Sequence, residues 1–315
     1  MKKIALIIGI SGQDGSYLAK FLLGKGYIVW GTSRDHQGNS FNNLKHLNVF
    51  DKVKTVSMVC EDFRSVFSTL TSCMPDEIYY LGGQSSVGLS FEQPAETIQS
   101  VVLGTLNLLE ACRMMDKNTR LYHAGSSECF GDTDGHPANE ETAFRPRSPY
   151  AVAKSSAFWL VDNYREAYNL FACTGILFNH ESPLRPTRFV TQKIIGTVKR
   201  ISKGSGEKLV LGRIDIARDW GWAPEYVEAM WLMLQQDKAE DFVIATGKTF
   251  TLQDFIRLAF AEVGLDWTEY VTHADEFMRP TDILVSSADP SKALAKLDWK
   301  AEIDMPNVVK LMMRS

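Results

Sequence analysis

The sequence predicts an α/β fold, in which a doubly wound parallel sheet carries a smaller C-terminal region. Two observations support this class. Short apolar runs, of the kind that strands covered on both faces need, alternate with segments of helical periodicity. A glycine-rich loop follows the first of these runs. Strands that alternate with helices are expected to pair in parallel through right-handed crossovers.

Seven apolar runs are predicted to be strands. They lie at residues 4–9, 27–34, 53–59, 77–83, 120–126, 172–179 and 242–247. Helical spacing of apolar residues predicts helices at 16–26 and 101–115, and a further helix is expected to begin near Val190. After residue 180 the pattern becomes mixed, and only the run at 242–247 reads as one more strand of the sheet.

Composition and charge exclude several classes of protein. The 315 residues are 45% hydrophobic and 23% charged, which is typical of a globular protein. The net charge is -4 and no basic run is present, so nucleic acid is not an expected partner. No apolar stretch reaches the roughly 18 residues that cross a membrane. The five cysteines form no CxxC pair, and the six histidines show no metal-ligand spacing, which predicts reduced thiols and no metal. A cytoplasmic location is also expected.

The glycine loop predicts a dinucleotide site. Gly9, Gly12 and Gly15 have the spacing GxxGxxG between the first strand and the next helix. Such a loop permits a tight turn, a close backbone approach to a pyrophosphate, and a helix N-terminus directed at the anion. A cluster of turn-forming glycines is the alternative. The position after the first strand favours the cofactor site, so the fold is predicted to be of the Rossmann type.

The end of the second strand indicates which dinucleotide binds. A carboxylate there would hold the 2'-hydroxyl of NAD, whereas a cation suits the 2'-phosphate of NADP. Arg34 comes first at this position and favours NADP, although Asp35 stands next to it. An exposed charge pair at a strand end is the alternative.

We therefore expect residues 1–180 to form an NADP-binding Rossmann domain, to which the strand at 242–247 returns. Residues 181–315 are expected to be mainly a substrate-binding region. No linker of biased composition separates the two parts, so the cleft between them is the predicted site.

Four residues could carry acid and base chemistry in that cleft. Tyr150 and Lys154 stand four positions apart at the opening of a predicted helix. An ammonium one turn from a phenol favours the phenolate and would lower the pKa of the tyrosine. Ser126 and Glu128 follow the fifth strand, at the sheet edge where doubly wound folds bind ligands. The alternatives are helix packing for the pair and turn formation for the serine.

Several longer blocks carry a family resemblance that covers essentially the whole chain. They are GISGQDGSYLA, PDEIYYLGGQSSVGLSFEQP, SSECFG, RPRSPYAVAK, YREAYNLFACTGILFNHESP, RDWGWAPEYVEAMWLML and FMRPTD. The chain resembles the GDP-mannose 4,6-dehydratase family of extended short-chain dehydrogenases/reductases. The glycine and YxxxK motifs are shared by the superfamily, while the NYREAY to FNHESP and RDWG to YVEAMW blocks are specific to the dehydratases.

The resemblance implies a role for each catalytic candidate. Tyr150 would take the proton of the sugar 4-hydroxyl, and Lys154 would hold the nicotinamide ribose. Ser126 would hydrogen-bond near O4. Glu128 would remove the C5 proton, which a 4-ketone makes acidic, and water would then leave C6. NADP would be oxidised and reduced within each cycle.

The resemblance also implies two sets of binding residues. The cofactor set is Gly9, Gly12, Gln13, Asp14, Gly15, Arg34, Asp62, Phe63, Gln84, Tyr150, Lys154, His180 and Arg185. The set for the GDP-sugar is Ser85, Glu128, Asn179, Arg218 and Arg279, in which arginines suit a diphosphate. A homodimer or homotetramer is also implied.

The chain departs from the family pattern at three places. Ser126 stands where threonine is usual, which keeps the hydroxyl. The segment SPLRPTRFVTQK differs from the usual SPRRGETFVTRK, so another GDP-sugar, such as a GDP-heptose, is an alternative substrate. Arg34-Asp35 replaces a double arginine in a loop that reaches the tetramer interface.

Two other functions fit the same fold. An NADP-dependent reductase or epimerase of a 4-keto sugar would not need Glu128. A non-catalytic dinucleotide sensor would have no use for Ser126, Tyr150 and Lys154 together.

Overall fold

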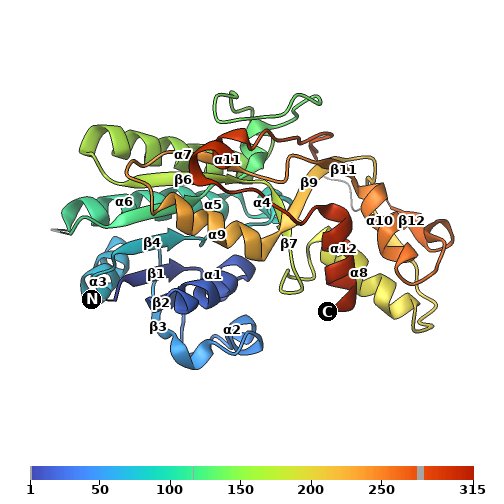
Figure 1. Ribbon diagram of the computed structural model, residues 1–315, viewed down its shortest axis with the longest axis horizontal. Coiled ribbons are helices and arrows are strands. Elements are labelled where there is room, and N and C mark those ends of the chain that lie inside the picture. Colours follow the sequence, from blue (N-terminus) through green and yellow to red (C-terminus); the bar gives the residue numbers. More distant parts are fainter. Residues whose placement is uncertain (1, 116, 275–279) are drawn as a thin grey trace.

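The centre of the computed structural model, which describes residues 2–115, 117–274 and 280–315, is a seven-stranded parallel sheet (Figure 1). Its strand order is β10-β6-β5-β4-β1-β2-β3. The strands are β1 (Ile4–Ile8), β2 (Ile28–Ser33), β3 (Lys54–Ser57), β4 (Glu77–Tyr80), β5 (Arg120–Ala124), β6 (Ala172–Leu177) and β10 (Phe242–Ile244). The predicted fold class and all seven predicted strands are confirmed, with strand ends that differ by a few residues.

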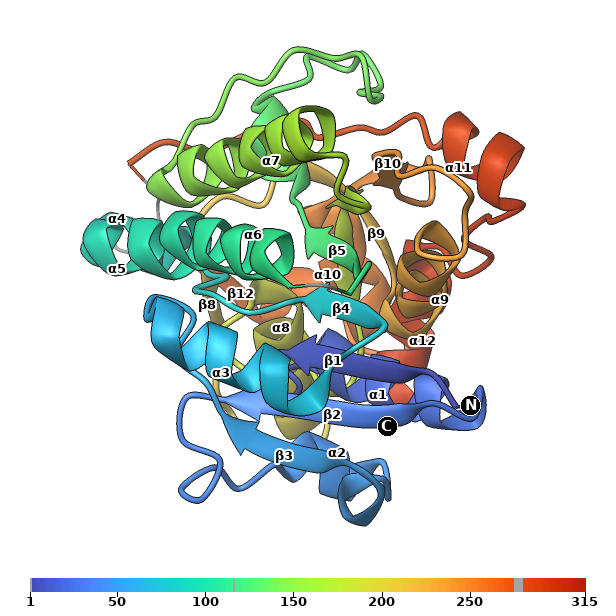
Figure 2. The ribbon, with the colours of Figure 1, turned by 90° about the vertical axis from the view of Figure 1, so that its left-hand side faces the viewer.

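Alternate residues of each central strand face opposite layers. Leu6 and Ile8 belong to a core formed with α3 (Phe63–Cys73), α6 (Gly104–Met114) and α7 (Pro149–Tyr168). Ala5 and Ile7 belong to the core on the other face, which includes α1 (Gln13–Gly24) and α9 (Ala223–Met233). Figure 2 shows these helices on the two sides of the sheet. Because both faces are covered, the central strands β1 and β6 are buried along almost their whole length, whereas the edge strand β3 has exposed ends.

The first helix begins earlier than predicted. The helix was expected from residue 16, but α1 starts at Gln13, with Gly12 as its N-cap. Gly15 therefore lies in the first turn of the helix, not in the loop. The reason is steric: a Cβ at Gly15 would come within 2.4 Å of the Gly9 carbonyl oxygen, so only glycine lets the helix start this close to the turn.

The predicted helix at 101–115 is the second half of a longer helical run. This run comprises α5 (Pro94–Ile98), a π-helical turn (Gln99–Leu103) and α6. The π turn lies where the Tyr80 hydroxyl donates a hydrogen bond to the Ser100 carbonyl, at 2.6 Å. Gly104 follows, where a Cβ would come within 2.4 Å of that hydroxyl. The extra residue of the π turn thus accommodates a buried tyrosine.

The C-terminal part adds two small sheets and a second apolar core. The sheets have the orders β11-β9-β7 and β12-β8. Their strands are β7 (Asn179–Glu181), β8 (Leu209–Leu211), β9 (Ala217–Trp222), β11 (Thr249–Thr251) and β12 (Val271–His273). The second core joins side chains of α8 (Val190–Ile201), α10 (Leu252–Ala261) and α12 (Met305–Arg314). The helix predicted near Val190 is confirmed.

The remaining elements are short. They are α2 (Asn42–His46), α4 (Val87–Glu92), α11 (Ser291–Leu297) and the 3₁₀ turns Phe50–Lys52, Ser127–Phe130 and Trp267–Glu269. In the described part of the chain, no helix is both long and apolar enough to cross a membrane.

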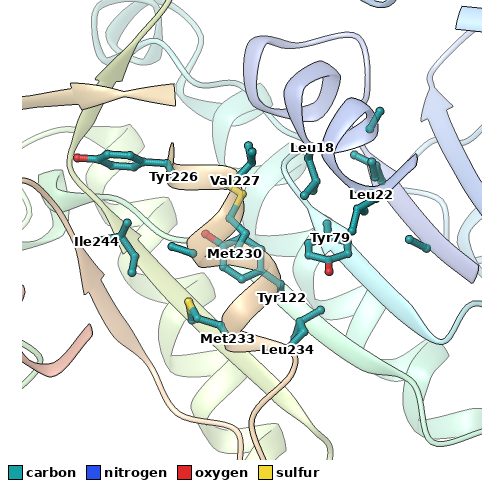
Figure 3. Close-up of a cluster of buried hydrophobic side chains, with 14 of the residues drawn as sticks. Leu18, Leu22, Tyr79, Tyr122, Tyr226, Val227, Met230, Met233, Leu234 and Ile244 are labelled. Atoms are coloured by element: carbon teal, nitrogen blue, oxygen red, sulfur yellow. The ribbon is translucent and has the colours of Figure 1, made fainter. Parts of the chain in front are cut away.

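Helix α9 packs on the large sheet, although it follows the substrate-region strand β9. Its Val227 and Met230 lie in one cluster with Leu18 and Leu22 of α1 (Figure 3). Met230 has no exposed surface. The chain therefore crosses between the two cores at β9, and the large sheet depends on a helix from the second half of the sequence.

Truncating Met230 should show this dependence. Met230→Ala removes a fully buried side chain and leaves a cavity, so we expect it to lower the free energy of unfolding by about 2–5 kcal/mol. Met114→Ala is the matched control, because Met114 is 54% exposed. Urea unfolding of both variants measures the difference. A loss in Met230→Ala no larger than in the control would contradict the packing described.

Candidate active site

A cavity of about 830 Å³ opens at the carboxyl edge of the large sheet. Its wall includes residues that follow β4, β5 and β6 and residues of β7, α8 and β9. Both the large sheet and the C-terminal part therefore contribute to it. The predicted site residues in its wall are Asp14, Gln84, Ser85, Ser126, Glu128, Tyr150, Lys154, Asn179, His180, Arg185 and Arg218.

The other predicted site residues are not in this wall. Gly9, Gly12, Gln13 and Gly15 form the turn and the first helical residues around Asp14. Arg34, Asp62 and Phe63 lie beyond the cavity, after β2 and at the start of α3. Arg279 lies outside the described residues.

The glycine loop holds the sheet and α1 unusually close. Gly9 has a φ of 88°, and a Cβ there would come within 2.9 Å of the Leu81 carbonyl oxygen. Gly12 caps α1 without any side-chain cap, so the first amides of the helix are available to an anion. This geometry fits a pyrophosphate, which needs close backbone approach and amide donors.

The charged residues after β2 have different surroundings. The Arg34 side chain is 76% exposed, and its nearest carboxylate is that of Glu96, at 3.9 Å. The Asp35 carboxylate accepts hydrogen bonds from the amides of Gln37 and Gly38, at 3.0 and 3.1 Å. Asp35 therefore closes its own loop, while Arg34 extends into solvent.

Two predicted cofactor residues have clear structural roles. Asp62 caps α3 by accepting a hydrogen bond from the Arg64 amide, at 3.0 Å. Gln84 uses its side-chain amide within its own loop, where Nε2 donates to the Ser86 carbonyl at 2.8 Å and to the Thr97 hydroxyl at 3.2 Å. Its Oε1 accepts from the Ser86 amide. The Gln84 side chain thus stabilises its own loop, which forms part of the cavity wall.

Ser126 and Tyr150 are in contact at the bottom of the cavity. Tyr150 is the second residue of α7, a helix capped by Ser148, and is 8% exposed. Burial raises the pKa of Tyr150 well above its ordinary value, while a hydrogen bond with Ser126 opposes this rise. The predicted lowering of this pKa by Lys154 is therefore wrong for this structure, because removal from water outweighs the groups that lower the pKa, which are the Ser126 hydroxyl and the Arg185 charge.

Lys154 lies one turn further along α7 and points at the sheet. Its Nζ donates a hydrogen bond to the Ala124 carbonyl at 2.7 Å and lies 5.9 Å from the centroid of the Tyr150 ring. Burial lowers the pKa of Lys154 to about 8. Lys154 is thus a buried cation that loses its proton far more readily than a surface lysine.

Asp14 and His180 form a buried ion pair that joins α1 to β7. The His180 Nε2 lies 3.0 Å from Asp14 Oδ2, and its Nδ1 lies 2.7 Å from the Phe178 carbonyl oxygen. Burial opposes both charges, but each charge stabilises the other. The pKa of Asp14 falls to about 2, and that of His180 is raised.

Cations from several elements line the far side of the cavity. Arg218 on β9 is 5% exposed and pairs with Asp282 at 3.3 Å. The sequence reasoning assigned no role to three further cations of the wall, which are Arg188, Lys193 and Arg213. Arg188 and Lys193 lie within the segment SPLRPTRFVTQK, whose departure from the family pattern was the available signal. The described residues contain no cluster of three or more His, Cys, Asp or Glu placed to hold a metal ion.

Comparisons with known proteins identify the family of the chain. The family model described as GDP-mannose 4,6 dehydratase matches residues 6–312. The chain is 45% identical to GDP-mannose 4,6 dehydratase 2 of Arabidopsis thaliana, over 99% of this chain and 86% of that protein. It is 42% identical to GDP-mannose 4,6-dehydratase of Vibrio cholerae, over 96% of this chain and 91% of that protein.

Solved structures with the same fold include a dTDP-glucose 4,6-dehydratase from Streptomyces venezuelae with bound NAD. Its TM-score is 0.87 at 20% identity, with 99% of this chain and 97% of that chain covered. The structure of a Pseudomonas aeruginosa protein named RMD, complexed with NADPH, has a TM-score of 0.83 at 21% identity, with coverage of 99% and 98%.

Replacing Lys154 by methionine should stabilise the protein without ligands at neutral pH. Its pKa of about 8 lies below the ordinary 10.5, so the folded state holds the proton less tightly than the unfolded chain. The buried charge therefore lowers the free energy of unfolding by about 3 kcal/mol below pH 8. This loss of stability disappears as the pH rises toward 10.5. We expect Lys154→Met to be the more stable protein at pH 7, by up to that amount, and the gap to narrow by pH 9.5.

Denaturant unfolding at both pH values measures the gap, with the exposed Lys52→Met as the control. A gap that does not change with pH would contradict the buried-cation description.

Proposed function

Because the chain belongs to the GDP-mannose 4,6-dehydratase family, we propose that Ser126, Glu128, Tyr150 and Lys154 convert GDP-mannose to its 4-keto-6-deoxy product in this cavity. The chain is accordingly a lyase that removes water from GDP-mannose. The observation that carries the proposed residue roles is the presence of all four side chains in one cavity wall. Glu128 is the decisive member, since a simple reductase or epimerase would not need it.

The residues of the glycine loop fit a nicotinamide dinucleotide. The close approach at Gly9, the uncapped start of α1 and the adjoining cavity suit its pyrophosphate. When bound, such a cofactor would supply hydride transfer, as acceptor from C4 of the sugar and as donor at C6. Two solved structures of the same fold, a dTDP-glucose 4,6-dehydratase and the protein named RMD, hold NAD and NADPH respectively.

We propose NADP as the dinucleotide. Arg34 follows β2, where a 2'-phosphate would lie, and its guanidinium is largely exposed. Asp35, which would favour NAD, already accepts two backbone hydrogen bonds in its own loop. A carboxylate that already accepts two hydrogen bonds is less able to accept another from a ribose hydroxyl. The positive charge of Arg34 therefore decides the local preference, and it favours a 2'-phosphate.

The cation-rich side of the cavity is proposed to hold the GDP diphosphate. Arg218 is the best-placed residue, because its fork is fixed by the Ala217 carbonyl at 2.9 Å and by Asp282. A guanidinium held in one orientation binds phosphate oxygens with little further loss of entropy. Asn179 and Ser85 line the same cavity and would contact the nucleotide sugar.

The chemistry at O4 falls to Tyr150 and Ser126. Both side chains line the cavity, and a hydrogen bond between them opposes the rise in the pKa of Tyr150. Tyr150 takes the O4 proton, and Ser126 holds the oxygen as it becomes a carbonyl. Because burial raises the pKa of Tyr150, this step needs positive charge close to the phenol, which the Lys154 ammonium supplies.

The chemistry at C5 and C6 falls to Glu128. A ketone at C4 makes the C5 hydrogen acidic, and the Glu128 carboxylate removes it as a proton. The electron pair of that bond forms a double bond between C5 and C6, while the C6 hydroxyl takes a proton from the Glu128 carboxyl and leaves as water. When hydride is added at C6, C5 regains a proton that comes from solvent. Glu128 is half-buried in the cavity wall, two residues after Ser126, so both groups reach neighbouring carbons of one sugar.

We further propose that the chain assembles as a homodimer or homotetramer in the cytoplasm. Three large side chains of α7, Val152, Trp159 and Tyr168, are 44%, 59% and 49% exposed. Met114, at the end of the neighbouring α6, is 54% exposed. Apolar surface of this kind is typical of a contact between subunits. All five cysteines are unpaired, which accords with a reducing compartment.

Glutamine at position 128 tests the proposed function. Glu128→Gln keeps the shape of the side chain but removes its basicity, so we expect the rate of 6-deoxy product formation to fall by at least about 100-fold. With GDP-mannose in heavy water, the unmodified enzyme should place deuterium at C5 of the product, as NMR and mass spectrometry would show.

The exposed Glu141→Gln is the matched control. Near-normal turnover in Glu128→Gln would contradict the role of this residue. Reduction or epimerisation without loss of water would favour the oxidoreductase alternative, and a preference for GDP-heptose within a panel of GDP-sugars would change the substrate.

Alanine at position 34 tests the choice of cofactor. The intact protein should bind NADP more tightly than NAD, and Arg34→Ala should reduce that preference by about tenfold or more, as expected for loss of a charged hydrogen bond to phosphate. Titration of both dinucleotides by calorimetry measures the preference, with the exposed Arg257→Ala as control. Tighter binding of NAD by the intact protein, or an unchanged preference in the variant, would contradict the proposal.

A further inference from the structure

Both ring nitrogens of His180 face oxygen atoms. Nδ1 lies 2.7 Å from the Phe178 carbonyl oxygen, and Nε2 lies 3.0 Å from the Asp14 carboxylate. A backbone carbonyl can only accept a hydrogen bond, so Nδ1 must carry a hydrogen. If Asp14 is ionised, Nε2 must carry one as well, and the ring is then an imidazolium.

The surroundings of Asp14 favour its ionised form. It is the second residue of α1, where the positive end of the helix dipole stabilises a negative charge. Its Oδ1 accepts a hydrogen bond from Gln13 Nε2 at 2.9 Å. The helix dipole and the Gln13 amide thus both favour the carboxylate, whose Oδ2 then accepts a hydrogen bond from His180 Nε2.

The surroundings of His180 favour a cation. Its ring stacks on Tyr226 of α9, with centroids 4.5 Å apart and planes at 23°, and an aromatic face stabilises a positive charge. The opposing cation is Arg185, whose Nε lies 3.3 Å from Glu181 Oε2. Two charged groups therefore face His180. Asp14 favours the positively charged ring, whereas Arg185, which is itself paired with Glu181, opposes it.

The pair joins the two sides of the cavity. Gln13 strengthens this junction, since its Nε2 also donates to the His180 carbonyl at 3.1 Å, and its Oε1 accepts from the Ser182 hydroxyl at 2.8 Å. Strand β7 in turn pairs in parallel with β9, the strand that carries Arg218. The glycine loop is thus connected through two strands to the cation-rich wall.

We propose that His180 is a permanent imidazolium whose pairing with Asp14 holds the glycine loop and the β7–β9 strands as one unit, which couples binding of the dinucleotide to binding of the GDP group. Asp14 and His180 act here as positioning residues. The coupling rests on the proposed function, whereas the protonation state of His180 does not.

NMR of the intact protein labelled with ¹⁵N-histidine tests the protonation state. We expect His180 to show two ring N–H signals from pH 6 to pH 8.5. In Asp14→Asn, the negative partner is lost, and His180 should become a neutral ring with one N–H at pH 8. A single ring N–H in the unmodified protein at pH 7 would overturn the proposal.

A binding cycle tests the coupling. We expect saturating NADP to increase the affinity for GDP by at least about fivefold in the unmodified protein, and GDP to do the same for NADP, since coupling is reciprocal. Asp14→Asn and His180→Gln should each remove this increase, while the exposed Asp51→Asn should retain it. Two independent variants keep the test valid if one fails to fold, which circular dichroism would reveal.

Each outcome of the cycle has one meaning. Two ring N–H signals together with independent binding of NADP and GDP would overturn the coupling. Coupling that survives in both folded variants would assign it to other residues and overturn the role of the pair. Failure to bind either ligand would instead count against the proposed function, while the NMR result would still stand.

Discussion

The structure of the cavity depends on one steric constraint, which is the contact between the glycine turn and the first helix. A side chain at Gly9 would meet the Leu81 carbonyl, and one at Gly15 would meet the Gly9 carbonyl. Only glycine lets α1 begin directly behind β1. This placement brings Asp14 to His180. Through β7 and β9 it also fixes where Arg218 stands relative to the sheet. A backbone requirement at two positions thus sets the spacing of charged groups in the cavity wall.

The same burial that shapes the cavity opposes its chemistry. Removal from water raises the pKa of Tyr150 and lowers that of Lys154 to about 8. Both shifts disfavour the phenolate and ammonium pair that proton transfer needs. The protein therefore keeps its reactive groups in an unfavourable environment at a cost in stability. In return, charge that develops on a buried substrate interacts strongly with these groups, because little water screens it.

Much of the fold could be predicted from sequence, because it depends on local patterns. Apolar runs and helical spacing located the strands and the helices α1 and α6. Contacts between distant segments could not be predicted in this way. The Asp14–His180 pair joins residues 166 positions apart, and helix α9, which follows a strand of the C-terminal part, packs in the core of the large sheet. The direction in which the pKa of Tyr150 shifts was also predicted wrongly. The spacing of residues in the sequence reveals a neighbouring lysine, but it does not reveal how deeply the tyrosine is buried.

The segment between β7 and α8 shows where selection of the sugar can differ without loss of the reaction. The proposed proton-transfer residues come from the loop after β5 and from α7, which packs on the sheet through Val161 and Tyr164. Arg188 and Lys193 instead lie on the stretch from the end of β7 into α8 that lines another part of the cavity wall. The hydrogen bond of Lys154 to the Ala124 carbonyl does not involve this stretch. In the proposed function, substrate choice and proton transfer therefore belong to separate parts of the chain, so substitutions at Arg188 and Lys193 would change the sugar and retain the reaction.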